Sequence, residues 1–343
     1  MLRRALLAAA LLPAVVASGE GGRTAPGDPF AFLDPGVQMS PAERGRLDAG
    51  ATVVKVLPAG ARELGVVAAV RTGATPERLI AWTREIAALR RSRYVPLVSR
   101  VSSPPRLEDF EALTLDAGDL DDLRRCRPGD CGLKLGAAEM ERIQQAMHGR
   151  ADWQEAGRQA FRRVALERVE RYMAEGDDAL PAYHDHPTPV SPAAEVDALV
   201  EELGLASPHL PGVADYVRGF PRITRADVAD SFVYWAVEAF GGKPIVSVSH
   251  VMLLRGDGTA GPAALTITKQ LLATHYRTGS LSLTAMTESG RGRHLVYVQR
   301  SHVDVLRGVF GGILRRMMEG RVRDEAPAVL SALRARIEAE DPP

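Results

Sequence analysis

Cysteine is scarce in this sequence. Its 343 residues include only two cysteines, Cys126 and Cys131, and both lie in the stretch RRCRPGDCGLKL. A structural zinc site needs about four ligands, and the spacing matches neither the CxxC redox motif nor the CxxCH haem motif. This scarcity disfavours metal or thiol chemistry at the pair and favours a single disulfide, provided that the compartment is oxidising.

An excess of charge of one sign is also missing. The chain has 43 basic and 43 acidic side chains, and aromatic residues make up 5% of it. Without a basic excess there is no electrostatic reason to expect nucleic acid as a partner. The sequence also has no P-loop, no dinucleotide-binding glycine pattern and no GxSxG nucleophile motif. We therefore predict no cofactor, and function has to be inferred from the fold and from the side chains inside it.

The N-terminus predicts the compartment. It reads MLRRALLAAALLPAVVASG: two arginines precede an apolar run that is too short to span a bilayer, and small residues follow. This pattern predicts a cleavable signal peptide over residues 1–19 and export to the periplasm or the outside. We find no second run long enough to cross a membrane, so no transmembrane segment is expected in the mature chain. Residues 20–48 are expected to form a flexible leader.

In an exported protein the two cysteines are expected to pair with each other. Between them lies Arg127-Pro128-Gly129-Asp130, in which proline fixes φ at one position and glycine is free to take a positive φ at the next. Such a turn brings the sulfur atoms together. We predict a local disulfide between Cys126 and Cys131 that stabilises the fold by about 2 kcal/mol.

The first part of the chain alternates strands with a helix. Residues 53–57 and 63–70 are rich in β-branched residues, and a helix is expected from the N-cap Thr75 and Pro76. Residues 94–103 predict an edge strand, because Pro96 cannot donate to a ladder. A further strand is expected over residues 131–135.

Residues 137–240 predict a block of helices. Trp153–Glu175 has an apolar stripe at helical spacing, and further helices are expected over residues 192–203 and 226–240. His184 and His186 lie two residues apart in YHDHP, a spacing that can chelate a metal ion on an extended backbone. Two imidazoles flanked by prolines are more typical of an exposed loop, and no third ligand can be named, so we predict no metal site.

The last hundred residues predict an antiparallel meander followed by a helix. Four β-runs separated by glycine-containing turns follow Lys243, and a long helical region extends over residues 303–338. This element order resembles the START-like helix-grip superfamily, also called the polyketide cyclase or lipid-transport superfamily. The resemblance implies an α+β fold in which a curved antiparallel sheet grips a long C-terminal helix.

The resemblance also implies a domain organisation and a ligand. Residues 49–136 and 241–343 would form the START-like domain, and residues 137–240 would be a helical insertion. Between sheet and C-terminal helix there would be a cavity for a hydrophobic small molecule or a lipid. Protein partners cannot be named from the sequence.

Candidate ligand-binding residues follow from alternation along the expected strands. His250 shares a face with apolar residues in VSVSHVML, and Lys269 and His275 share a face with apolar residues in LTITKQLLATH. Polar groups on an inward face need partners, and a ligand is one way to supply them. Alternatively, His250 is a core histidine with protein partners, Lys269 extends to a rim and His275 belongs to a turn.

The remaining candidates lie on the next strand and on the C-terminal helix. Tyr297 is one of them, and Phe310, Ile313 and Leu314 are expected to line the cavity opposite His250. The first functional hypothesis is an exported carrier or sensor of a hydrophobic molecule. The alternatives are a cavity enzyme with His250 as general base and Lys269 or Tyr297 as electrophilic partner, and a protein-interaction module that uses the helical insertion.

Overall fold

The structure is a computed structural model that describes residues 29–33, 37–239, 242–259, 261–289, 292–307, 311–339 and 342. Its centre is an eight-stranded sheet in the order β1-β2-β8-β7-β6-β5-β4-β3, and every neighbouring pair is antiparallel. The strands are β1 (Val53–Leu57), β2 (Glu63–Thr72), β3 (Leu97–Arg100), β4 (Val228–Glu238), β5 (Ile245–Arg255), β6 (Ala264–Ala273), β7 (Arg277–Ser289) and β8 (Gly292–Val303).

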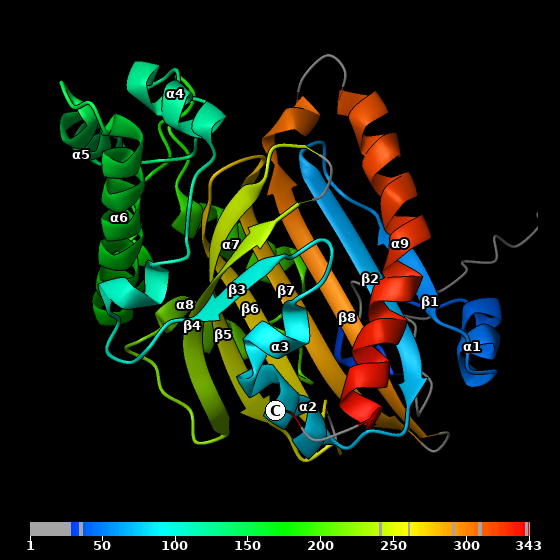
Figure 1. The fold of residues 1–343 in the computed structure, drawn as a ribbon. Coiled ribbons are helices and arrows are strands. Elements are labelled where there is room, and N and C mark those ends of the chain that lie inside the picture. Colours follow the sequence, from blue (N-terminus) through cyan, green and yellow to red (C-terminus); the bar gives the residue numbers. More distant parts are fainter. Residues whose placement is uncertain are drawn as a thin grey trace, which may run out of the picture.

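Three helices lie on one side of the sheet, which we call the front face. They are α2 (Pro76–Arg84), α3 (Ile86–Arg90) and α9 (Gly311–Ala339), and all three lie in front of the strands in Figure 1. α2 begins at the N-cap Thr75, whose side chain accepts from the Arg78 N–H. α9 packs against β1 and β2, and its C-terminal half buries Leu330 and Ile337 in the front core. An antiparallel sheet packed against a long C-terminal helix is the helix-grip arrangement, so the predicted fold class is confirmed.

The insertion lies between β3 and β4. It contains η2 (Leu107–Phe110), α4 (Ala117–Arg125), α5 (Ala137–Met147), α6 (Trp153–Glu175), η3 (Gly176–Ala179), α7 (Pro192–Glu202) and α8 (Val213–Gly219). In Figure 1, α4, α5 and α6 form a group beside the sheet, and α7 and α8 lie behind it. The insertion therefore packs on the back face, opposite α9. None of the described helices is both long and apolar enough to cross a membrane.

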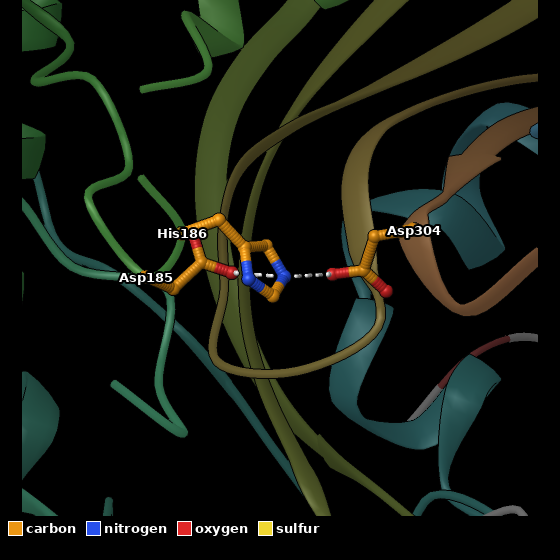
Figure 2. A group of neighbouring side chains, drawn as sticks. All are labelled: Asp185, His186 and Asp304. Carbon is orange, nitrogen blue, oxygen red and sulfur yellow. Dashed lines mark ion pairs between the residues drawn. The ribbon is translucent and has the colours of Figure 1, made fainter. Parts of the chain in front are cut away.

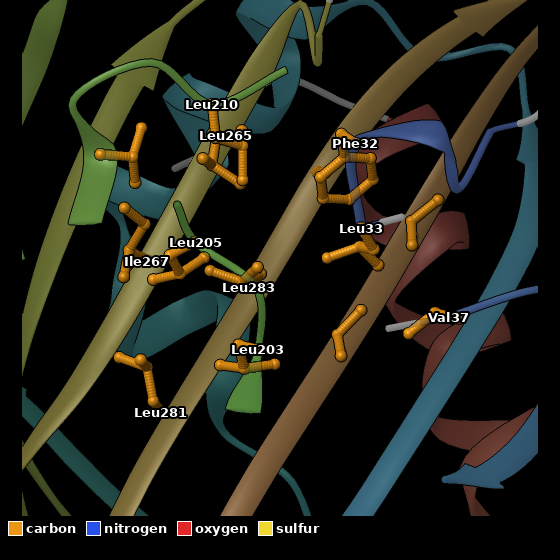
Figure 3. Packing of buried hydrophobic residues seen from close by; sticks show 14 of the residues in the cluster. Phe32, Leu33, Val37, Leu203, Leu205, Leu210, Leu265, Ile267, Leu281 and Leu283 are labelled. Carbon is orange, nitrogen blue, oxygen red and sulfur yellow. The ribbon is translucent and has the colours of Figure 1, made fainter. Parts of the chain in front are cut away.

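The N-terminal segment also packs on the back face. Phe32 and Leu33 of η1 (Ala31–Leu33) join the core formed by strands β6, β7 and β8 and the segment after α7, as Figure 3 shows. α1 (Pro41–Asp48) follows and begins with a capping box formed by Ser40 and Glu43. The described part of residues 29–48 therefore differs from the expected flexible leader. Residues 1–28, which include the predicted signal peptide, lie outside the described residues.

Two secondary-structure predictions are wrong. Residues 226–240, expected to be helical, contain β4. Its FVYWAV segment is covered on both faces of the sheet, so the sequence lacks the apolar–polar alternation that identifies a half-exposed strand. Residues 131–135, expected to be a strand, form bends and loop. The insertion accordingly lies between Arg100 and Val228 rather than within residues 137–240.

The predicted disulfide is confirmed. Cys126 and Cys131 are bonded, with their Cα atoms 4.5 Å apart, directly after α4. Gly129 takes the positive φ of 94° that the turn needs. The backbone N–H groups of Gly129 and Cys131 donate to the carbonyls of His184 and Asp185, so the turn is held against the segment that follows α6.

Candidate ligand-binding face

Polar side chains form a continuous group on the front face of the central strands. The register pairs Ser249 with Gln270, Thr268 with Ser282, and Ser282 with Gln299. Because alternate residues of a strand share a face, the neighbours two positions away join the same group. We call this group the polar stripe, and it consists of Ser249, Thr266, Thr268, Gln270, Ser280, Ser282, Thr284, Gln299 and Ser301.

The polar stripe lies in the middle of the sheet and yet keeps some exposed surface. Thr268, Ser282, Thr284 and Gln299 are partly exposed, although each belongs to a strand with neighbours on both sides. α9 contacts the sheet at β1 and β2, and α3 contacts β3 at the far edge. α2 contacts β6, which carries part of the stripe. Two of the front-face helices therefore flank the stripe and the third reaches one of its strands, while part of the stripe's surface remains accessible.

Some polar atoms of the stripe bond to each other and others have no partner. Gln299 donates from Nε2 to the hydroxyls of Ser280 at 3.2 Å and Ser301 at 3.0 Å. By contrast, the buried Thr266 Oγ1 and Gln270 Oε1 make no hydrogen bond within the described structure, although Gln270 is only 4% exposed. A buried polar atom without a partner costs about 1–3 kcal/mol. A bound molecule that forms hydrogen bonds with these atoms would remove that cost.

The stripe ends at a group of ionic side chains. Arg277 Nη2 and Ser247 Oγ both donate to the carboxylate of Glu238, at 3.0 and 2.6 Å. Arg90, at the end of α3, lies over the Tyr234 ring, with the guanidinium carbon 5.3 Å from its centroid. Burial works to raise the pKa of Glu238, but Arg277 and Arg90 outweigh it and the pKa lies below its usual value. The Glu238 carboxylate is therefore charged near neutral pH.

Apolar surface borders the stripe on the side of β2 and α9. Leu64 and Val66 lie opposite Ser301 and Gln299 in the register and are partly exposed. In the first half of α9, Leu314, Met318 and Val322 are also partly exposed, whereas Leu330 and Ile337 in its second half are buried. The front face therefore combines a polar floor with an apolar wall.

His250 and Lys269 lie on the opposite face from the one we expected. They are neighbours across β5 and β6, so their predicted shared face is correct, but the insertion covers that face and α9 does not. His250 is fully buried: its Nδ1 lies 2.7 Å from the Tyr172 hydroxyl and its Nε2 lies 2.7 Å from the Ser231 hydroxyl. Burial, with a smaller contribution from Lys269, holds the pKa of His250 well below its usual value.

Lys269 and His275 likewise have partners in the insertion. Lys269 Nζ donates to Asp177 Oδ1 at 2.8 Å and to the Val217 carbonyl at 2.9 Å. The imidazole of His275 contacts the Asp119 carboxylate and the Gly132 carbonyl. These two side chains and His250 link the insertion to the sheet, and their role in ligand binding stays a prediction.

The other predicted site residues are divided between the front face and solvent. Tyr297 lies on the front face, where its hydroxyl bonds to Gln299. Ile313 is 52% exposed and lines no enclosed space, and Leu314 is partly exposed. Phe310 lies outside the described residues. The sequence could show which residues share a face, but it could not show which face α9 covers.

Asp185, His186 and Asp304 meet in the arrangement shown in Figure 2, where the imidazole lies between the two carboxylates. Their potential ligand atoms lie within 4.8 Å of one another. However, the buried Lys134 ammonium contacts both carboxylates, with 2.6 Å to Asp185. Burial works to lower the pKa of Lys134, but the two aspartates outweigh it and raise the pKa. The ammonium offsets one of the two carboxylate charges, and the buried Asp304 Oδ1 makes no hydrogen bond within the described residues. The group is an ion-pair cluster that joins the insertion to η4 (Asp304–Arg307).

Comparison with known proteins adds little to the description of this chain. No family model and no curated protein matches the chain. A match among solved structures is the crystal structure of the ZhuI aromatase/cyclase from Streptomyces sp. R1128, with 16% sequence identity and a TM-score of 0.25. It covers 43% of this chain and 87% of that chain. The fold assignment therefore depends on the strand order and on the packing of α9.

Proposed function

We propose that this protein binds a small amphiphilic molecule on the front face of its sheet. The observation that carries the proposal is the polar stripe, a set of partly exposed and incompletely hydrogen-bonded side chains in the centre of a sheet, bordered by apolar residues of β2 and α9. Ligand sites combine apolar walls with a few convergent polar groups. The expected position between sheet and C-terminal helix is retained, but the floor is more polar than a purely hydrophobic ligand requires.

Binding agrees better with the titratable groups than catalysis does. A general base needs access to the substrate and a pKa near the working pH. His250 has hydrogen-bond partners at both ring nitrogens, lies under the insertion and has a strongly lowered pKa. On the front face, Glu238 is paired with Arg277 and its pKa is also lowered. These groups hold and orient other groups, and they are poorly suited to moving a proton.

We also propose that the protein is exported. The support is the signal-like N-terminal sequence together with a disulfide whose two cysteines are the only ones in the chain. N-terminal sequencing of the protein recovered from the cell envelope tests this, because export predicts a mature N-terminus close to residue 20. An N-terminus at Met1 in protein from the cytoplasm, with both thiols free, contradicts it.

A co-purified ligand tests the binding proposal. Native mass spectrometry of the full chain should show an adduct that organic extraction removes, and Thr268→Leu should reduce its occupancy because the larger side chain fills the middle of the stripe. Thr188→Leu is the matched control, since Thr188 is exposed in the loop after α6. Equal occupancy in both variants contradicts a ligand on the front face.

A further inference from the structure

The ionic end of the polar stripe has an unbalanced charge. Arg90 and Arg277 carry two positive charges there, and Glu238 is the one carboxylate that acts on both within the described part of the chain. Glu238 is already engaged by Arg277 and by the Ser247 hydroxyl. Among the described residues, no carboxylate lies within ion-pair distance of Arg90.

The surroundings keep Arg90 charged. Burial works to lower the pKa of its guanidinium, but Tyr234, Glu238 and Tyr297 outweigh burial, so the pKa is raised. Because phenols are neutral near pH 7, the negative charge that acts on Arg90 at that pH is Glu238. Arg90 lies over the Tyr234 ring, and a hydrogen bond with the Tyr234 side chain also raises its pKa. A guanidinium has five N–H donors, so this contact leaves others for another partner. Tyr234 belongs to β4 and Tyr297 to β8, so Arg90 interacts with side chains from both sides of the stripe.

Glu238 is the counter-charge that acts on Arg90, but it is bonded to Arg277 and makes no direct ion pair with Arg90. A partly buried guanidinium without such a direct pair loses hydration that a bound anion could replace. The fork of guanidinium N–H groups matches the two oxygens of a carboxylate or a phosphate. Arg336 adds positive charge nearby, since its guanidinium donates to the carbonyls of Ala88 and Leu89 at the end of α3. The field at this end of the stripe therefore favours an anion and disfavours a cation.

We infer that the ligand of the front face carries an anionic group, a carboxylate or a phosphate, which pairs with Arg90. This inference rests on the proposed binding function and adds the charge of the ligand to it. The apolar part of the ligand then extends along the wall formed by Leu64, Val66 and the first half of α9. The ligand class is an anionic amphiphile, held at one end by an ion pair and along its length by apolar contact.

Isothermal titration of the full chain with four probes of equal chain length tests the inference. The probes are dodecanoate, dodecyl phosphate, dodecanol and dodecyltrimethylammonium. At least one anionic probe should bind about tenfold or more tightly than dodecanol, as a charge-assisted hydrogen bond predicts, and the cationic probe should bind most weakly. The tighter of the two anionic probes identifies the headgroup chemistry.

Two variants separate recognition by Arg90 from a structural role. Arg90→Gln should remove the preference for the anionic probes while dodecanol binding persists, and Arg90→Lys should restore part of the preference because it restores the charge. Thermal unfolding of both variants confirms that they fold. Equal binding of dodecanoate, dodecyl phosphate and dodecanol to the wild type overturns the inference and leaves the binding function intact. An anionic preference that persists in Arg90→Gln has the same consequence. Failure of all four probes to bind contradicts the proposed function itself.

Discussion

The docking of α7 on the back of the sheet should depend on pH. Glu195 of α7 is buried and accepts hydrogen bonds from Thr278 of β7 at 2.8 Å and from His302 of β8 at 2.6 Å. Arg62 also pairs with Glu195, and His302 extends to Glu202 at 3.1 Å. Replacing Glu195 by Gln removes the charge on which this network is centred, while the size of the side chain is kept.

The pKa of Glu195 determines how large the loss of stability should be. Burial works to raise it, but the hydrogen bonds from His302, Arg62 and Thr278 outweigh burial and lower it from 4.5 to about 2. That fall corresponds to about 3 kcal/mol of stabilisation. Because the folded pKa lies below the unfolded value, this stabilisation is present above pH 4.5 and is lost as the pH falls towards 2.

The stabilisation contributed by His302 has the opposite dependence on pH. Burial works to lower its pKa, but Glu195 and then Glu202 outweigh burial and raise it above 6.5. A raised folded pKa means that the contribution of His302 is complete below pH 6.5 and is lost as the pH rises through the folded value. The ion pair between Glu195 and His302 therefore contributes fully between pH 4.5 and pH 6.5, the unfolded pKa values of the two groups.

Urea unfolding of the wild type and of Glu195→Gln across a pH series measures this. At about pH 5.5 the variant should be less stable by about 3 kcal/mol, and the difference should shrink towards both acid and alkaline pH. Glu201→Gln on the same helix is the matched control, because Glu201 is 66% exposed, and its effect should stay within about 0.5 kcal/mol. A wild-type advantage over Glu195→Gln that stays constant between acid and alkaline pH refutes the reasoning.

Other variants test the remaining features. Replacing Cys126 and Cys131 together by Ser should lower the free energy of unfolding by about 2 kcal/mol in urea titrations and leave probe binding unchanged, because the bridge lies in the insertion; lost binding contradicts this. His250→Leu should cost about 2–4 kcal/mol, because the hydroxyls of Tyr172 and Ser231 lose their partner inside the core, whereas dodecanoate affinity should be retained; a variant of wild-type stability that no longer binds indicates that the ligand lies on the back face. Lys134→Met should destabilise by about 3–5 kcal/mol because two carboxylates lose their counter-ion, and a neutral effect in thermal melts contradicts the ion-pair cluster.

Much of the architecture was predictable because its signals are local. Trp153–Glu175 has the predicted bounds, since Gly176 ends the helix with a positive φ of 81°. The four strands after Lys243 were separable by their turns, and the disulfide followed from the turn between its cysteines. In each case the residues that decide the structure lie within a few positions of each other in the sequence.

The faces of the sheet could not be predicted in the same way. Both faces are covered, so β5 is buried at every position from Ile245 to Leu254 and its apolar alternation does not identify the side that α9 takes. The same double burial made β4 look like a helix. The arrangement depends on where the insertion packs, which is a contact between segments far apart in the sequence.

The polar stripe was not predicted, although alternating polar residues in the sequence indicate it. Polar residues occupy alternate positions in Thr266, Thr268 and Gln270 on β6, and in Ser280, Ser282 and Thr284 on β7. Alternate polar residues on neighbouring strands are usually interpreted as a solvated face. The helices on this side of the sheet distinguish the face from a solvated one, and they support the proposal that it borders a site.

Methyl NMR of the protein labelled at threonine and isoleucine tests the position of the ligand most directly. Thr268 and Ile267 are adjacent in β6 but lie on opposite faces of the sheet, Thr268 in the polar stripe and Ile267 in the back core. On titration with dodecanoate, or with the co-purified ligand, the methyl signals of Thr266, Thr268 and Thr284 should shift while that of Ile267 stays in place. Shifts centred on Ile267, with the stripe threonines unchanged, would contradict a ligand on the front face.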